Sequence, residues 1–228
     1  WKRSKLSSAS AGEIDISADR SSGVLRAIID ANVRVRSSIN QGGYVNGTIA
    51  AQLSESNILG VVGPIAVGDA KLYVDGFVAG VMAQNPGAKV NVNYIESFSD
   101  VNLANEAAKA HVSNGADVLT GTAQMVVGAT GVALEEDIPW FGTQSNQDAL
   151  GASIVVASQV YHWEVVLNEM IAEIESGTLG GTTYTLTLEN GGLVVEFNAG
   201  YGLDPGIQAA AEQTVADLAS GAITTGVE

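Results

Sequence analysis

The hydrophobic residues of this chain are grouped in short runs that alternate with helix-length stretches. Four apolar runs lie at residues 58–63, 89–95, 117–120 and 138–142, and three longer stretches separate them. Parallel strands need a crossover of about a dozen residues, so this alternation predicts a parallel sheet with helices on its faces. We therefore predict a doubly wound α/β unit with right-handed crossovers over residues 58–142.

The intervening stretches carry start and stop signals of helices. Residues 66–84 place apolar side chains at three- and four-residue steps, and Pro86 follows in a sequence that cannot continue a helix. Asp100 is suited to cap the next helix, which is expected to end at Gly115. A third helix is predicted over residues 124–136.

Weaker patterns flank this central unit. Val33 and Val35 alternate with arginines as in a half-exposed strand, and Asn40 is expected to cap a helix after them. The sequence Asn190-Gly191 stands between two alternating runs and predicts a β-hairpin. The other elements expected here are strands at 24–30, 153–160, 182–188 and 193–197 and helices at 162–176 and 207–220.

Composition restricts the classes of function. The chain has 25 Asp and Glu residues against ten Lys and Arg, a formal net charge of −15, and from Ala110 onward it has no Lys or Arg. Nucleic-acid binding needs clustered basic groups, so such an acidic body argues against it. The absence of cysteine excludes thiol catalysis and zinc–cysteine sites. No apolar run approaches the roughly 18 residues of a membrane-spanning helix.

Catalytic and metal sites find little support in the sequence. His111 and His162 are the only histidines, and neither has a second ligand at helical spacing, so we expect solvated or capping roles and no metal. The acids at 135–137 are consecutive and would point in different directions on a helix. No nucleophile, base and acid can be assembled, so we predict a protein without catalytic residues or cofactor that is not an enzyme.

Aromatic and amide side chains gather instead on the loops that should follow the strands. In parallel sheets ligands bind beyond the carboxyl ends of the strands, where these loops lie. Flat rings and neutral amides suit a planar polar heterocycle, although the same residues could be core aromatics and surface glutamines. The residues in question are Phe98, Gln124, Gln144, Ser145, Asn146, Gln147, Tyr161, His162 and Trp163. We expect Phe98, Gln124, Gln144 and Tyr161 to line one cleft.

Several fragments, in their order and spacing, resemble one family. They are Gly42-Gly43-Tyr44-Val45-Asn46-Gly47, Ile58-Leu59-Gly60-Val61-Val62-Gly63, Tyr73-Val74-Asp75-Gly76-Phe77-Val78-Ala79-Gly80, Ser97-Phe98-Ser99-Asp100, Asn114-Gly115-Ala116-Asp117-Val118, Phe141-Gly142-Thr143-Gln144-Ser145-Asn146-Gln147 and Ser158-Gln159-Val160-Tyr161-His162-Trp163. Together they are similar to the basic membrane protein family of ABC-transporter substrate-binding lipoproteins, over about residues 27–228.

The resemblance implies a type I periplasmic-binding-protein-like α/β fold with two parallel Rossmann-like lobes joined by three crossings. Residues 1–38 would be an N-terminal tail and the remnant of an incomplete first lobe. Residues 39–143 would form the complete second lobe, with the chain passing back near 143–147. Residues 144–228 would hold the cross-over segment and C-terminal elements shared between the lobes.

The resemblance also implies a function. A purine base or nucleoside would bind in the cleft between the lobes, in contact with Phe98, Gln124, Gln144, Ser145, Tyr161 and Trp163. Gln144 stands where nucleoside binders of the family have an aspartate and Tyr161 where many have a lysine, which favours a base over its nucleoside.

The implied protein is extracytoplasmic, at the cell surface or in the periplasm, and delivers its ligand to a membrane ABC permease. It would be held at the membrane by an anchor absent from this chain. Two other functions are left open: a structural or assembly protein that reuses the fold, and a nucleoside-acting enzyme. A homo-oligomer is also left open.

Overall fold

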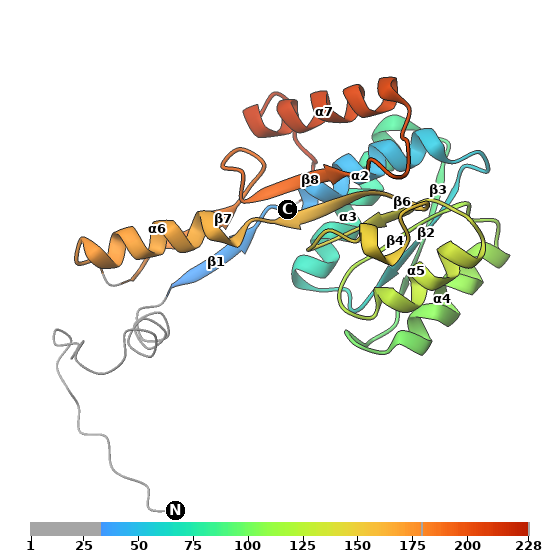
Figure 1. Ribbon diagram of the computed structural model, residues 1–228, viewed down its shortest axis with the longest axis horizontal. Helices are drawn as coiled ribbons and strands as arrows, with labels where there is room; N and C mark the ends of the chain where they lie inside the picture. The colour runs from blue at the N-terminus through green and yellow to red at the C-terminus, as the bar shows by residue number, and fades with distance from the viewer. Residues whose placement is uncertain (1–32, 179, 228) are drawn as a thin grey trace, which may run out of the picture.

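The computed structural model describes residues 33–178 and 180–227, and their largest element is a six-stranded sheet in the order β3-β2-β4-β5-β6-β8 (Figure 1). Its strands are β2 (Ile58–Gly63), β3 (Lys89–Tyr94), β4 (Val118–Gly121), β5 (Trp140–Gly142), β6 (Val155–Tyr161) and β8 (Leu193–Phe197). The strands β2 to β6 are parallel, and β8 pairs antiparallel with β6 at one edge. The parallel sheet predicted over residues 58–142 is confirmed, with a doubly wound strand order.

Helices cover both faces of this sheet and bury two separate sets of side chains. They are α2 (Ile39–Leu53), α3 (Gly68–Gln84), α4 (Val101–Ser113), α5 (Val126–Glu135) and α7 (Pro205–Ser220). One apolar cluster joins α2, α3 and α7 to Leu59 and Val61 of β2, and the other joins α4 and α5 to Val62. Neighbouring strand residues point to opposite faces, so the near-continuous apolar run of β2 serves both layers.

Glycines allow α2 and α3 to pack backbone against backbone. Gly43 and Gly47 lie one turn apart on α2, and Gly76 and Gly80 lie one turn apart on α3. A Cβ atom added at any of the four would come within 3.0 Å of a backbone carbonyl oxygen of the other helix. The two helices are therefore closer than side chains at these positions would permit.

A second, smaller unit extends away from the six-stranded sheet (Figure 1). It contains β1 (Arg34–Ser37), which pairs in parallel with β7 (Thr183–Leu186), and α6 (Trp163–Glu175). A separate apolar cluster formed by Val166, Met170, Tyr184 and Leu186 joins α6 to these strands.

The chain crosses between the two units at three places. These crossings follow β1, follow β6 and separate β7 from β8. The prediction that the chain passes back near residues 143–147 is wrong, because β5 and β6 on either side of that segment are neighbours in one sheet. The first departure from this sheet along the chain comes after Tyr161. The assignment of residues 1–38 to the remnant of a first lobe stays a prediction.

The predicted β-hairpin around Asn190 is also wrong. A turn does form there, since Asn190 Oδ1 accepts hydrogen bonds from the backbone N–H groups of Thr187 and Gly192, both at 3.0 Å. The strands on either side nevertheless pair elsewhere, β7 with β1 and β8 with β6. The turn therefore redirects the chain from one sheet to the other.

The two predicted helix caps have opposite outcomes. Asp100 caps α4 as expected, because its Oδ1 accepts from the backbone N–H groups of Asn102 and Leu103, both at 3.0 Å. The expected cap of α2 by Asn40 is wrong, since Asn40 lies inside the helix and donates to Thr225 Oγ1 at 3.0 Å. The strand expected at 24–30 and the N-terminal tail lie outside the described residues.

His111 lies in the core, which corrects the expectation of a solvated or capping residue. Its side chain on α4 is 6 % exposed, and its Nε2 lies 3.1 Å from the carbonyl oxygen of Val61 in β2. A side chain at Gly60 would collide with it, so the glycine makes this position available. Burial lowers the pKa of His111, and the hydrogen bond to Val61 offsets part of this shift.

Mild acid is expected to destabilise the fold through His111. Its folded pKa lies below the ordinary value of 6.5, so below about pH 6.5 the unfolded chain binds the extra proton first and the free energy of unfolding falls until the folded pKa is passed. His111→Gln keeps an N–H donor and does not titrate. We would measure the free energy of unfolding of both proteins in urea at about pH 7.5 and about pH 5. The wild type should exceed the variant by less at the lower pH. An advantage independent of pH would contradict this expectation.

Candidate functional site

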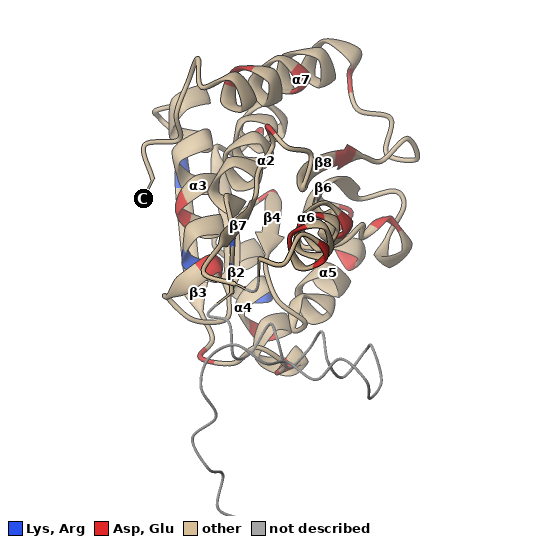
Figure 2. Cartoon of the chain, turned by 90° about the vertical axis from the view of Figure 1, so that its left-hand side faces the viewer, with Lys and Arg blue, Asp and Glu red and all other residues tan. Residues whose placement is uncertain are grey.

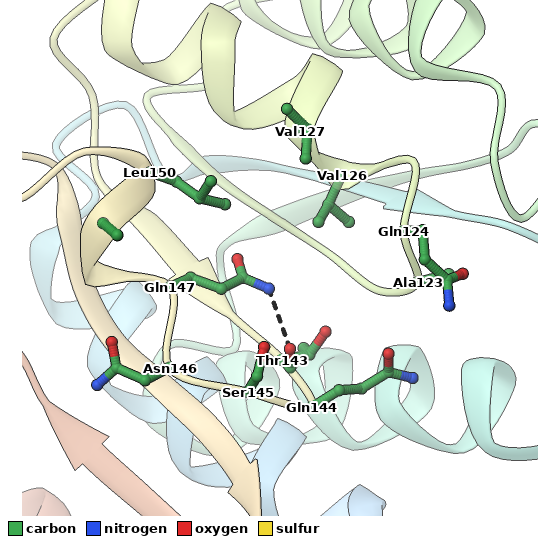
Figure 3. A pocket seen from close by; sticks show the side chains of 11 residues that line it. Ala123, Gln124, Val126, Val127, Thr143, Gln144, Ser145, Asn146, Gln147 and Leu150 are labelled. Atoms are coloured by element: carbon green, nitrogen blue, oxygen red, sulfur yellow. Dashed lines mark hydrogen bonds between the residues drawn. The ribbon is translucent and has the colours of Figure 1, made fainter.

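A pocket of about 480 Å³ lies beyond the carboxyl ends of β4 and β5 (Figure 3). The loops that follow these strands, together with the first turn of α5, supply its walls. Its lining residues are Ala123, Gln124, Val126, Val127, Thr143, Gln144, Ser145, Asn146, Gln147, Ala149 and Leu150. This is the edge of a doubly wound sheet at which ligands bind.

The pocket lining combines polar and apolar side chains and includes no charged one. Exposed amides of Gln124 and Gln144 offer both donors and acceptors. The amide of Asn146 is already engaged, because its Nδ2 donates to Glu196 Oε2 at 2.8 Å and its Oδ1 accepts from the backbone N–H of Asp148 at 2.9 Å. Apolar side chains of Val127 and Leu150 line another part of the wall (Figure 3). A neutral ligand with an apolar face and a hydrogen-bonding edge suits such a lining better than a charged one.

Gln147 anchors the wall formed by the loop after β5. Its Oε1 accepts from Trp140 Nε1 at 2.8 Å, and its Nε2 donates to the carbonyl oxygen of Thr143 at 3.0 Å (Figure 3). Its backbone N–H donates to Ser158 Oγ at 3.1 Å. A single buried side chain thus ties the loop to β5, while its backbone is tied to β6.

Two residues of the pocket have strained backbones. Ala123 has φ +79° and Gln144 has φ +69°, in the left-handed region that non-glycine residues rarely occupy. Each lies on a loop just beyond a strand end. Strained residues of this kind persist where the surrounding structure holds them, and they concentrate at functional sites.

The structure brings some of the predicted site residues together. Gln124, Gln144 and Ser145 line the pocket. Phe98 is 49 % exposed and outside the lining, but its carbonyl oxygen accepts from the backbone N–H of Met125 at 3.0 Å, next to Gln124. The loops after β3 and β4 are therefore in contact.

Tyr161 and Trp163 lie at the crossing from β6 to α6. Their rings are 5.2 Å apart between centroids, and Trp163 is 48 % exposed. Neither residue lines the pocket, although the backbone N–H of Tyr161 donates to the carbonyl oxygen of Gln144 at 3.3 Å. That all six predicted residues serve one ligand stays a prediction.

Two polar residues at the crossings were missed from the sequence. Ser37 Oγ donates to Asp69 Oδ2 at 2.9 Å and lies 3.2 Å from the hydroxyl oxygen of Tyr161. Burial raises the pKa of Tyr161 to about 12, the hydrogen bond to Ser37 opposes this shift and the charge of Asp69 adds to it. The position of Asp69 in the first turn of a helix that follows a strand was the available signal.

Two general features of the described residues bear on the class of protein. No helix within 33–178 or 180–227 is long and apolar enough to cross a membrane. Within the same ranges no group of three or more His, Asp or Glu residues is placed to hold a metal ion. Segments of Asp and Glu, red in Figure 2, occur on several helices, on β8 and on loops, whereas the described Lys and Arg residues lie in β1, α3, β3 and α4.

Comparison with known families decides the class. The family described as PnrA-like ABC transporter substrate-binding proteins matches residues 22–216. This chain belongs to that family. The resemblance to the basic membrane protein family of ABC-transporter substrate-binding proteins is thereby confirmed.

Relatives of this PnrA-like chain are similar over most of its length. A purine-binding protein of Brucella abortus is 25 % identical over 181 residues, which cover 79 % of this chain and 51 % of the relative. The nucleoside-binding ABC transporter protein BmpA of Lactococcus lactis is 25 % identical over 175 residues, with 68 % and 49 % covered. The PnrA-like chain thus spans about half the length of the curated relatives it matches.

A solved structure agrees with the type I fold class. The ABC transporter solute-binding protein of Conexibacter woesei superimposes with a TM-score of 0.70 at 25 % identity, covering 84 % of this chain and 64 % of that one. The α/β fold with parallel strands that the sequence predicted for the PnrA-like chain is confirmed.

Proposed function

We propose that this chain binds a purine base, or a related neutral planar molecule, as the solute-binding component of an ABC transporter. The observation that carries the proposal is the uncharged pocket at the carboxyl ends of β4 and β5, which the exposed amides of Gln124 and Gln144 line beside apolar side chains. Amides can pair with the donors and acceptors on the edge of a base, and apolar walls can cover its faces.

The relatives support the ligand class. One is named as a purine-binding protein and another as a nucleoside-binding protein. Gln144 lies in the pocket of this chain, where the resemblance places an aspartate in nucleoside binders. A carboxylate makes charge-assisted hydrogen bonds with ribose hydroxyls that are about twice as strong as those of an amide, so its replacement favours the base.

The cellular setting follows from the same family. Proteins that bind solutes for ABC transporters work outside the cytoplasm and deliver ligand to a permease, which we propose as the partner of this chain. The net charge of −15 fits an extracytoplasmic protein that must stay soluble and dispersed.

Adenine is expected to bind at least as tightly as adenosine. Phe98 lies outside the pocket lining, but its loop contacts the loop of Gln124, and we propose that its exposed ring stacks on the base. Recognition by an amide is also available to the bare base, whereas Gln144 and Tyr161 offer little additional affinity for the sugar. Phe98→Ala should weaken both ligands alike, by about tenfold if it removes a stacking interaction of about 1 kcal/mol and some buried area. Calorimetric titration with the matched pair measures both effects.

A control separates stacking from a general loss of apolar surface. Leu134 lies on α5 outside the pocket lining and is 48 % exposed, almost as much as Phe98. Leu134→Ala should leave both affinities unchanged. A nucleoside bound a hundredfold more tightly than its base would overturn the proposed preference, and no binding of either ligand would overturn the proposed ligand class.

A further inference from the structure

The conformation of Gln144 has to be held by its surroundings. Its φ of +69° lies in the left-handed region, which glycine adopts readily and glutamine does not. The conformation directs where the side chain leaves the backbone, and in Figure 3 this side chain lies at the rim of the pocket. Whatever holds the backbone therefore also aims the amide.

Strand β6 holds both backbone polar groups of Gln144. The side-chain Oε1 of Gln159 accepts from the backbone N–H of Gln144 at 3.3 Å. Two residues further along β6, the backbone N–H of Tyr161 donates to the carbonyl oxygen of Gln144, also at 3.3 Å. The second bond needs no particular side chain on β6, whereas the first depends on the amide of Gln159.

Gln159 is an unusual residue for its position. It is fully buried in the middle of a sheet, and its Nε2 has no hydrogen-bond partner among the described residues. An apolar side chain of the same length would avoid burying this amide nitrogen. Packing of the core therefore does not account for a glutamine here, while the bond from its Oε1 to Gln144 does.

Helix α2 provides the space for this side chain. Gly42 faces Gln159, and a Cβ added at Gly42 would come within 3.0 Å of Gln159 Cγ. Any other residue at Gly42 would displace the side chain whose oxygen reaches Gln144. A glycine on α2, a glutamine on β6 and the strained residue of the pocket thus form one connected arrangement.

We infer that Gln159 is a positioning residue that holds Gln144 in its left-handed conformation and thereby sets how the pocket recognises its ligand. The part that concerns ligand recognition rests on the proposed function, but the positioning itself does not. Gln159 lies outside the pocket lining, so it acts on the ligand only through Gln144.

Hydrogen exchange tests the positioning without any ligand. Gln159→Met keeps the length of the side chain and removes the acceptor. The backbone amide of Gln144 should then exchange at least about tenfold faster, because its hydrogen-bond partner is lost. Gln52→Met, the same substitution on the exposed end of α2, should leave this amide unchanged. Unchanged exchange at Gln144 in Gln159→Met would overturn the inference.

A double-mutant cycle with adenine tests the consequence for binding. Asparagine adopts positive φ more readily than glutamine. In the Gln144→Asn variant the left-handed backbone conformation at this position should therefore depend less on Gln159. Gln159→Met should weaken the binding of adenine about tenfold when residue 144 is glutamine and less than about twofold when it is asparagine. An equal loss in both backgrounds would mean that Gln159 only supports the fold, and would overturn the inference. If wild-type chain binds no adenine, the proposed function fails while the exchange result still decides the positioning.

Discussion

Replacing Gly80 by valine is expected to prevent stable folding of the chain. A Cβ atom at Gly80 would lie within 3.0 Å of the carbonyl oxygen of Tyr44, and both groups belong to helix backbones that cannot move aside independently. Helices α2 and α3 would have to separate and expose the buried side chains between them, such as Val45 and Phe77. We expect a loss of more than about 4 kcal/mol in the free energy of unfolding, a large part of the roughly 5–15 kcal/mol of a typical domain.

Gly131 provides the matched control. It lies within α5, and a Cβ atom added there has no heavy atom within 4 Å. Gly131→Ala should therefore leave the fold intact and stabilise it by up to about 1 kcal/mol, through the higher helix propensity of alanine. Circular dichroism with urea unfolding would measure both variants. A Gly80→Val variant as stable as the wild type would show that the helices can separate at little cost.

Gln147→Leu is expected to lower stability and to abolish ligand binding together. The substitution leaves Trp140 Nε1 and the carbonyl oxygen of Thr143 without their partners in a buried site. Each buried group that loses its partner costs roughly 1–3 kcal/mol, so we expect a loss of about 2–4 kcal/mol. The loop after β5 would also lose the contacts that hold the wall of the pocket.

The same substitution at Gln124 distinguishes the two effects. Gln124 lines the pocket but is exposed, so Gln124→Leu should leave the free energy of unfolding within about 0.5 kcal/mol of the wild type and affect only the affinity for the ligand. Thermal unfolding and calorimetric titration of both variants give the comparison. Equal stability of the two variants would contradict the anchoring role of Gln147.

Local patterns were sufficient to predict the central sheet and its helices. Strand β2 and helix α3 depend on apolar periodicity and on stop signals such as Pro86, which neighbouring residues determine. The cap at Asp100 is equally local. Pairing partners are not local, which is why the turn at Asn190 was predicted correctly as a turn and wrongly as a hairpin.

The candidate site was predictable in part for a similar reason. Gln124 and Gln144 follow two strands whose carboxyl ends share one edge, so the topology alone places them together. Ser37 and Asp69 meet only because the chain crosses between its two units. Gln159 sits within a β-branched run and shares the pattern of a core strand, so its role depends on a contact that the sequence does not display.

The pairing of β1 with β7 has a consequence for how the chain folds. Arg34 pairs with Thr183, so this short parallel contact closes a loop of 149 residues, the difference between the two numbers. Closing so long a loop has an entropy cost that the pairing of four residues cannot offset by itself. We therefore expect the six-stranded sheet to assemble first and to bring β1 and β7 together. During synthesis on the ribosome, β1 is made before the whole of the intervening chain and remains without its partner until β7 has been made.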